Sequence, residues 1–265
     1  SEIGGVDAGG VLTDAAGRRH KADLVVAADG VNSRIRDMLN LLESRRYLDE
    51  GAYRVLIPRE PGEIPQDRAG TVVEWWSGRR RILYSACSAT EVYAALVGPH
   101  ADEAARRMPE ALDDWIGAFP GLAGPLNRMR TAVDWDTVRW QRFQTVRLRR
   151  WSAGVVAVVG DAAHAMPPNL GQGGGCSMMN ALALAVAVED AARPVPEALA
   201  AWEAQERPLT DHTQRWAGTY SRLTRWPQAA RAPVLWMMSN VGWLRRQRQR
   251  AERHHAAGTD GLGAA

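Results

Sequence analysis

The stretch at residues 155–188, VVAVVGDAAHAMPPNLGQGGGCSMMNALALAVAV, constrains the fold of this chain more than any other. It opens with Val155–Val159, an unbroken apolar run rich in β-branched residues, which predicts a short, buried strand of a parallel sheet. Gly160 and Asp161 end the run, so a carboxylate is expected at the end of the strand. A carboxylate in that place either binds a ligand or caps a turn.

A rigid turn and a glycine run separate this strand from a helix. Pro167 and Pro168 fix the φ angle and should prevent an early helix start, and the segment 171–175 reads GQGGG. A long apolar helix is then expected from Ser177. The glycines would bring backbone N–H groups close to a ligand at the positive end of the helix dipole. Taken alone, such a turn also occurs in α/β proteins without a cofactor, and His164 is typical of core packing.

A second block with a similar pattern lies upstream, ADLVVAADGVNSRIR at residues 22–36. Leu24–Ala28 predicts another buried strand, which Asp29 and Gly30 end. A short helix is expected next, over Val31–Leu42. It carries two arginines that could neutralise a phosphate, although surface ion pairs explain them equally well.

Together, the two blocks resemble those of the FAD-dependent aromatic hydroxylases, the single-component flavoprotein monooxygenases similar to p-hydroxybenzoate hydroxylase. The resemblance runs from about Lys21 to Pro208. It implies an α/β fold: an incomplete Rossmann-like FAD-binding domain with an inserted antiparallel-sheet substrate domain and C-terminal helices. The expected divisions are 1–45 and 151–192 for the FAD-binding domain, 46–150 for the substrate domain, 193–250 for the C-terminal helices and 251–265 for a disordered tail.

The resemblance also implies the chemistry. In that family NADH or NADPH reduces FAD, oxygen forms a C4a-hydroperoxyflavin, and its distal oxygen attacks an electron-rich ring. The implied substrate is an aromatic or polyketide-like small molecule, with molecular oxygen as the second reactant. Neither the substrate nor a catalytic base can be read from the residues. Aromatic side chains on the predicted sheet are more often core than ligand contacts; they are Trp75, Trp76, Tyr84, Trp135, Trp140 and Phe143.

Matching the family motifs residue by residue assigns the cofactor contacts. The aspartate matching Asp161 binds the ribityl hydroxyls, and the one matching Asp29 is associated with both FAD and the nicotinamide cofactor. The glycine run would face the pyrimidine edge of the flavin, and the two prolines would form a wall beside the ring. The full expected set is Asp29, Gly30, Arg34, Arg36, Gly160, Asp161, Pro167, Pro168, Gly171, Gln172, Gly173, Gly174 and Gly175.

Two departures from the family pattern matter. No G-x-G-x-x-G fingerprint occurs, because GGVDAGG at residues 4–10 lacks both a buried strand before it and a helix after it. The chain is therefore expected to bind FAD poorly alone and to self-associate. Two alternatives stay open: a non-catalytic remnant or subunit needing a partner with the dinucleotide-binding fold, and a related flavin reductase or epoxidase. The second departure is MMNA in place of the family's IEDA, which leaves Asn180 instead of an acid.

Composition excludes several classes. The formal net charge is only +3, and the basic side chains are arginines except for Lys21, so nucleic-acid binding is not expected. The densest basic run, Arg245–Arg253, is interpreted as a solvated helix face. Two cysteines suit a reducing cytoplasm, and no signal peptide is visible. No uncharged apolar run of spanning length lies outside the glycine-led helix, and His254-His255 lacks metal-ligand spacing.

The remaining elements follow from local patterns. Residues 1–19 predict an antiparallel ribbon, and 102–119 has helical spacing. Strands are expected at Tyr53–Ile57, Thr71–Trp76, Arg81–Ala86, Val92–Val97 and Ala132–Arg149. Helices are expected from Pro196 to a stop at Pro208, from Leu209 to Trp226 and from Pro233 to Arg250.

Overall fold

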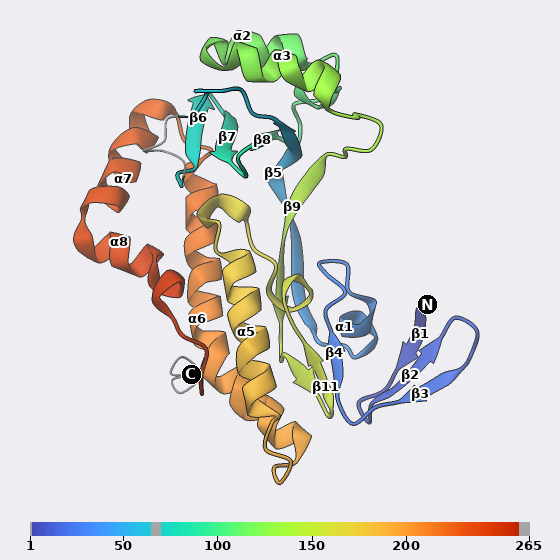
Figure 1. Cartoon of the computed structure of the whole chain (residues 1–265). Coiled ribbons are helices and arrows are strands. Elements are labelled where there is room, and N and C mark those ends of the chain that lie inside the picture. Colours follow the sequence, from blue (N-terminus) through green and yellow to red (C-terminus); the bar gives the residue numbers. More distant parts are fainter. Residues whose placement is uncertain (1, 65–69, 260–265) are drawn as a thin grey trace. The chain divides into compact units, whose positions relative to one another are not determined.

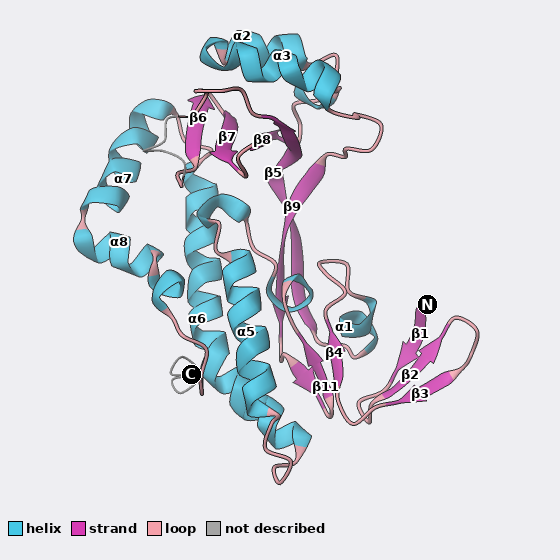
Figure 2. Cartoon of the chain, in the orientation of Figure 1, coloured by secondary structure: helices cyan, strands magenta, loops and turns pink. Residues whose placement is uncertain are grey.

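The computed structural model describes residues 2–64 and 70–259, and the chain divides into two compact units. The discontinuous unit comprises Ser1–Arg46 and Gln144–Ala265, and the inserted unit comprises Tyr47–Phe143. Figures 1 and 2 show the elements of both units. Two long strands, β5 (Leu42–Pro58) and β9 (Gln141–Leu148), carry the chain across the boundary between them. The insertion is thus made through paired strands rather than through loose linkers.

The discontinuous unit begins with the expected antiparallel ribbon. Its strands are β1 (Ile3–Val6), β2 (Val11–Asp14) and β3 (Arg19–Lys21), in the order β1-β2-β3. Gly154 lies against the first turn of this ribbon with φ +57°, and a Cβ there would lie 2.1 Å from the Ala8 carbonyl oxygen. Only glycine fits that contact.

A second, three-stranded sheet forms the centre of the discontinuous unit. It consists of β10 (Ser152–Ala153), β11 (Val156–Val158) and β4 (Val25–Ala27), in the order β10-β11-β4. The pairing of β11 with β4 is parallel, with Val156 opposite Val25 and Val158 opposite Ala27, as predicted for the run Val155–Val159. The strand β4 is only partly buried, because Val26 is 46% exposed. Because every residue of β11 is fully buried, the strand carries no polar alternation.

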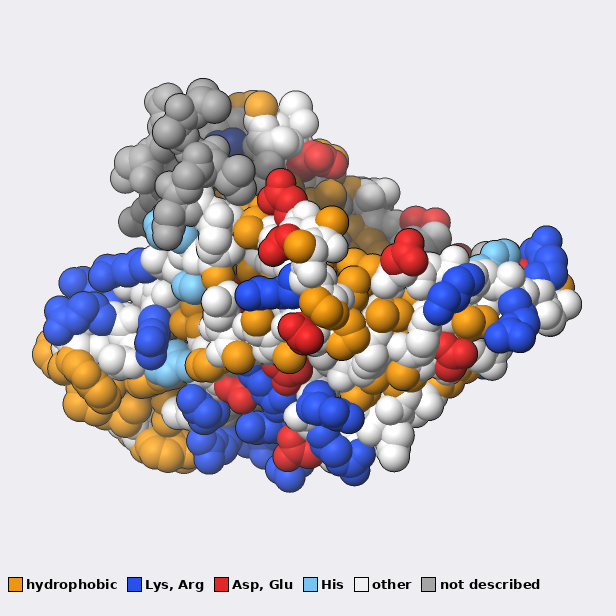
Figure 3. Space-filling model, turned by 90° about the horizontal axis from the view of Figure 1, so that it is seen from below, with side chains coloured by type: hydrophobic (Ala, Val, Ile, Leu, Met, Phe, Trp, Pro, Cys, Tyr) orange, Lys and Arg blue, Asp and Glu red, His pale blue; other side chains and the backbone are white. Residues whose placement is uncertain are grey.

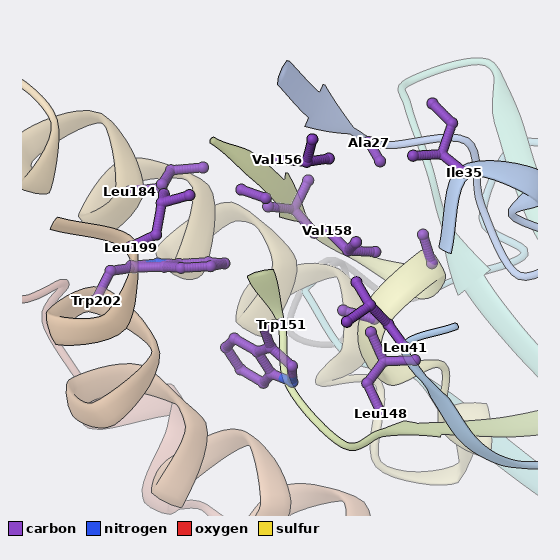
Figure 4. Close-up of a cluster of buried hydrophobic side chains, with 14 of the residues drawn as sticks. Ala27, Ile35, Leu41, Leu148, Trp151, Val156, Val158, Leu184, Leu199 and Trp202 are labelled. Atoms are coloured by element: carbon purple, nitrogen blue, oxygen red, sulfur yellow. The ribbon is translucent and has the colours of Figure 1, made fainter. Parts of the chain in front are cut away.

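The core of this unit forms around β11 (Figure 4). Valines of the sheet, leucines of the helices and two tryptophans, Trp151 and Trp202, pack together there. The helices are α5 (Gly173–Ala187) and α6 (Val195–Leu223), which lie side by side (Figure 1). This packing holds the glycine-led helix in a fixed place beside the parallel strands.

The start of α5 differs from the prediction. The helix begins at Gly173 rather than at Ser177, so the glycines form its first turn instead of a loop. A one-turn helix, α4 (Asp161–His164), and a 3₁₀ turn, η4 (Pro168–Leu170), precede it. Pro167 and Pro168 do not interrupt α4, because this helix ends at His164, before the two prolines.

The prediction that a helix stops at Pro208 was wrong, because α6 continues through it. Trp202, Glu206 and Thr210 are buried on one side of the helix, and this packing favours continuation. Pro208 and Ala204 lie on the exposed side. Water can therefore reach the Ala204 carbonyl, which loses its helical donor at Pro208.

Other boundaries also moved. The helix expected over residues 31–42 is only α1 (Arg34–Met38), because Leu42 already belongs to β5. The last expected helix is two helices, α7 (Gln228–Asn240) and α8 (Gly242–Arg248), with an extended residue, Val241, between them. Its predicted start, Pro233, lies inside α7.

The segment expected to be a disordered tail packs on the discontinuous unit as far as it is described. After η5 (Arg250–Arg253), His254 Nε2 lies 3.0 Å from Glu206 Oε2, and the Ala257 N–H donates to Glu206 Oε1 at 3.0 Å. Ala256 is 1% exposed. Residues 260–265 of the predicted tail lie outside the described residues.

The inserted unit is an antiparallel sheet covered by helices on one face. Between β5 and β9 the chain adds β6 (Val73–Ser77), β7 (Arg80–Ala86) and β8 (Glu91–Pro99), and the sheet order is β6-β7-β8-β5-β9. Two helices, α2 (Leu112–Ala118) and α3 (Ala123–Ala132), pack Leu112, Trp115 and Leu126 against it. The expected helix over 102–119 is broken into η2 (Ala104–Arg106) and α2, and η3 (Pro120–Leu122) and α3 were not predicted.

Candidate cofactor site

The ends of two parallel strands bring the two sequence motifs together. Because β4 and β11 are parallel neighbours, their carboxyl ends meet at one edge of the sheet, and the Val159 N–H donates to the Ala27 carbonyl at 3.0 Å. Asp29 and Asp161 therefore both follow strands that end at this edge. In open α/β sheets ligands bind at this kind of edge.

The first turn of α5 lies against the same edge. Gly160 has φ +61°, and a Cβ at that position would lie 3.6 Å from Ser177 Oγ. Gly174 and Gly175 are exposed, and a Cβ at either would have no atom within 4 Å. First-turn N–H groups of a helix have no acceptor within it, and the dipole is positive there. The turn is therefore an open surface lined by backbone N–H groups, and it suits a ligand that is anionic or accepts hydrogen bonds.

The two strand-end aspartates have different surroundings. Asp29 Oδ2 accepts hydrogen bonds from the Arg34 N–H at 3.0 Å and the Ile35 N–H at 3.4 Å, so it caps α1 together with Ser33. Asp161 is exposed, and no residue in the described ranges donates a hydrogen bond to it. Its carboxylate is available to a ligand without breaking a protein contact.

The two arginines also differ. Arg36 is fully buried, and its Nη1 donates to the Val31 carbonyl at 3.2 Å and the Ala162 carbonyl at 3.1 Å. It ties α1 to α4 and is not accessible to a ligand. Arg34 is exposed and pairs with Glu2, so it is the one of the two that a phosphate could reach.

Gln172 connects the glycine turn to the segment after α8. Its Nε2 donates to the Arg248 carbonyl at 3.0 Å and to Glu252 Oε1 at 2.9 Å, while its buried Oε1 has no hydrogen-bond partner among the described residues. A cavity of about 300 Å³ lies here, lined in part by Gly171, Gly175 and Glu252. Sequence reasoning missed these contacts, because nothing in the arginine-rich run signals them.

The remaining predicted site residues flank the turn. Pro167 is buried, and Pro168 is exposed and opens η4. Gly171 ends η4 in the left-handed conformation, with φ +68°. A larger cavity, about 740 Å³, lies apart from the motifs between β10 and α6, so volume alone does not identify the site.

A polar network is buried beneath the site. The Asn180 amide nitrogen lies 3.0 Å from His164 Nε2 and donates to Thr210 Oγ1 at 3.1 Å, and Trp202 Nε1 donates to the Asn180 carbonyl oxygen at 2.8 Å. His164 is thus a packing residue that links α4 to α5. Burial lowers the pKa of His164 to about 4, so the ring is neutral at physiological pH.

The predicted aromatic residues of the inserted unit are mostly core. Tyr84 and Phe143 are buried, and Trp135 and Trp140 contact the Tyr53 ring edge-on. Trp75 and Tyr84 line a cavity of about 540 Å³. Burial and the neighbouring Glu63 raise the pKa of Tyr84, so this phenol stays protonated and cannot act as a base at neutral pH.

Two negative findings apply to the described ranges, 2–64 and 70–259. None of the helices there combines the length and apolarity that crossing a membrane requires. No cluster of three or more potential metal-ligating side chains occurs in that part of the chain.

An accessible carboxylate and an open helix N-terminus at the edge of a parallel strand pair are typical of α/β proteins that bind nucleotide cofactors. The family model described as "FAD binding domain" matches residues 5–217, and the chain belongs to this family.

Curated relatives and solved structures agree with this assignment. A putative 2-heptyl-3-hydroxy-4(1H)-quinolone synthase of Rhodococcus erythropolis is 41% identical over 244 residues, covering 90% of this chain and 62% of the relative. The synthase of that name from Mycobacteroides abscessus is 39% identical, covering 86% of this chain and 60% of the relative. The solved 2-methyl-3-hydroxypyridine-5-carboxylic acid oxygenase is similar with a TM-score of 0.81 and 35% identity, over 96% of this chain and 65% of that one. The chain therefore spans less than two thirds of each of these proteins.

The buried histidine makes stability depend on pH. The unfolded chain protonates His164 near its ordinary pKa of 6.5, and the folded chain only near 4. The unfolded state therefore binds more protons between these values, and the free energy of unfolding falls as pH drops through this window. We expect wild type to lose about 2 kcal/mol more than His164→Gln between pH 7 and pH 5, measured by urea unfolding. The control is His255→Gln, because His255 is exposed; this variant should lose as much unfolding free energy as wild type. If wild type and His164→Gln lost equal amounts of unfolding free energy, the lowered pKa of His164 would be contradicted.

Proposed function

We propose that this protein takes part in FAD-dependent hydroxylation of an aromatic small molecule, with NADH or NADPH as reductant and oxygen as co-substrate. The observation that carries the proposal is the convergence of Asp161 and the first turn of α5 at one edge of the β4–β11 pair. Membership of the FAD-binding family and the similarity to a solved oxygenase with 35% identity support it.

The residues of this edge fit the chemical groups of FAD. Asp161 would accept hydrogen bonds from ribityl hydroxyls, because its carboxylate is exposed and has no partner in the described part of the chain. The N–H groups of Gly173–Gly175 would bind the acceptor atoms of the pyrimidine edge, and Gln172 Oε1 would accept from a ring N–H. The exposed Arg34 side chain would neutralise a phosphate of FAD. Pro167 and Pro168 would form a rigid wall beside the flavin ring.

These residues would act on the reaction through position and charge. Bound flavin supplies the two-electron reduction and the activation of oxygen. The N-terminus of α5 would stabilise negative charge on the reduced ring, because its dipole is already oriented before the charge forms. The neutral His164–Asn180 pair would hold α4 and α5 in register without adding a charge near the ring.

The substrate proposal comes from the relatives with about 40% identity. Both are named for a quinolone that carries a ring hydroxyl and a heptyl chain. We propose a similar bicyclic ring with an apolar chain for this protein. In the balanced reaction, one oxygen atom of O₂ is inserted into a ring C–H bond to give a hydroxyl, and the other leaves as water. NAD(P)H supplies two electrons as hydride, and one proton from solvent completes the water.

Labelled oxygen tests this function directly. With FAD in large excess, to offset the weak binding expected of this chain, the protein supplied with NAD(P)H, ¹⁸O₂ and a 2-alkyl-4-quinolone should yield a product that carries one labelled hydroxyl, detected by mass spectrometry. NAD(P)H oxidation without label in the product would favour a flavin reductase and contradict the proposal. Labelled water in place of labelled oxygen is the control, because a monooxygenase takes the hydroxyl oxygen from O₂.

Asp161→Ala should weaken FAD binding. The lost charged hydrogen bonds are worth about 1.5–3 kcal/mol, which raises the Kd about ten- to hundredfold. The measurement is a fluorescence titration with FAD, and the unfolding free energy should stay unchanged because Asp161 has no partner in the described residues.

Asp29→Ala serves as the matched comparison. It should lower the unfolding free energy by about 1 kcal/mol, because the Arg34 and Ile35 N–H groups lose their acceptor. An unchanged FAD affinity in Asp161→Ala would count decisively against the ribityl assignment.

Gly174→Ala should separate stability from cofactor binding. Alanine favours the helix by about 0.5–1 kcal/mol, and the structure has open space for its Cβ, so the protein should become more stable. If the flavin contacts this backbone, the same methyl group should raise the FAD Kd about tenfold, equivalent to 1.4 kcal/mol.

Gly218→Ala is the control for this variant. It lies in α6, also with open space for a Cβ, and should gain stability without losing FAD affinity. If Gly174→Ala behaved in the same way as Gly218→Ala, the first turn of α5 would not contact the flavin.

A further inference from the structure

The exposed face of α7 is apolar. Ala229, Ala232, Pro233, Trp236 and Met237 recur at intervals of three and four residues, and all are exposed. Trp236 is 66% exposed. Helices of soluble proteins normally bury such a stripe and expose their polar residues. On α7 the apolar stripe faces outward instead, which indicates that something covers it.

The apolar surface continues beyond α7 at both ends. Trp226 precedes the helix and is 45% exposed, and Val241 and Trp243 follow it at 41% and 57%. Figure 3 shows hydrophobic side chains gathered at the left-hand end of the molecule, the end at which Figure 1 places α7 and α8. A group of exposed large apolar side chains such as this one is typical of an interaction site. We call it the α7–α8 patch: Trp226, the exposed α7 residues named above, Val241 and Trp243.

The charged residues in this stretch of the chain are mostly cationic. Residues 222–253 contain eight arginines, of which Arg231 is buried, and one acidic residue, Glu252. Arg245 and Arg246 are exposed on α8, next to Trp243 in the chain. The surface therefore combines tryptophans with arginine side chains. A partner that complements it would present an apolar layer beneath an anionic one.

We infer that the α7–α8 patch binds the surface of an anionic lipid bilayer. Tryptophan prefers the boundary between headgroups and acyl chains, and arginines beside it attract anionic lipids. A helix with such a face lies in the plane of this boundary rather than crossing it. A second copy of the chain is the weaker occupant, because a symmetric contact would bring the same arginine-rich surfaces together. The inference does not depend on the proposed flavin chemistry.

Vesicle binding tests the inference on the full 265-residue chain. The chain should co-sediment with phosphatidylcholine vesicles containing about one third phosphatidylglycerol, and added salt should weaken this binding. Pure phosphatidylcholine should bind it at least about tenfold more weakly. Tryptophan fluorescence should shift to shorter wavelength only with the anionic vesicles.

Two pairs of variants assign the binding to the patch. The double variant Trp236→Ser/Trp243→Ser should reduce partitioning about tenfold or more, and Arg245→Gln/Arg246→Gln should remove the preference for anionic lipid. Trp75→Ser and Arg19→Gln, exposed residues elsewhere, are the matched controls and should bind like wild type. Circular dichroism confirms that each variant is folded.

Three results would overturn the inference. The first is no binding to anionic vesicles, and the second is binding that the patch variants leave unchanged. The third is a wild-type dimer, seen by light scattering, that the Trp236→Ser/Trp243→Ser variant converts to a monomer while vesicle binding is absent. That last result would identify a second copy as the occupant.

Discussion

The parallel pairing of β4 with β11 is the contact on which the rest of the discontinuous unit depends. The two strands are three residues each, and they come from segments more than a hundred residues apart in the chain. Their pairing places both strand-end aspartates at one edge and gives α5 and α6 an apolar surface on which to pack. Because β11 is fully buried, its position leaves little freedom to the turn that follows it.

Burial then decides which motif residues can reach a ligand. Arg34 and Arg36 are two residues apart on one short helix, yet one is exposed and the other is fully buried. Hydrogen bonding, not burial, separates the two aspartates: both are exposed, but Asp29 caps α1, whereas Asp161 has no partner in the described chain. The candidate site is therefore smaller than the motifs, and consists mainly of Asp161, the open turn of α5 and the Gln172 amide.

Local sequence patterns predicted the strands and helices that are determined mainly by their own residues and not by contacts with distant parts of the chain. The β-branched run of β11 and the strand-like runs of β7 and β8, bounded by turn residues, indicated strands, and the structure confirms them. The start of α5 was missed because glycine has low helix propensity, while packing on α6 overrides that preference. Pro208 is a similar case, since buried contacts on the opposite side of α6 outweigh one lost hydrogen bond. Which arginine is buried could not be predicted, because burial depends on the contact of Arg36 with Ala162, far away in the chain.

The contacts of Gln172 have a consequence for the order in which the protein can mature during synthesis. Its partners, Arg248 and Glu252, follow it by 76 and 80 residues, and His254 and Ala257 bind Glu206 from the same late segment. A ribosome releases the strands, the glycine turn and most of α6 before this segment exists. The glycine turn therefore remains without one of its supports until nearly all of the described chain has emerged, so the candidate cofactor edge forms later than the strands on which it rests.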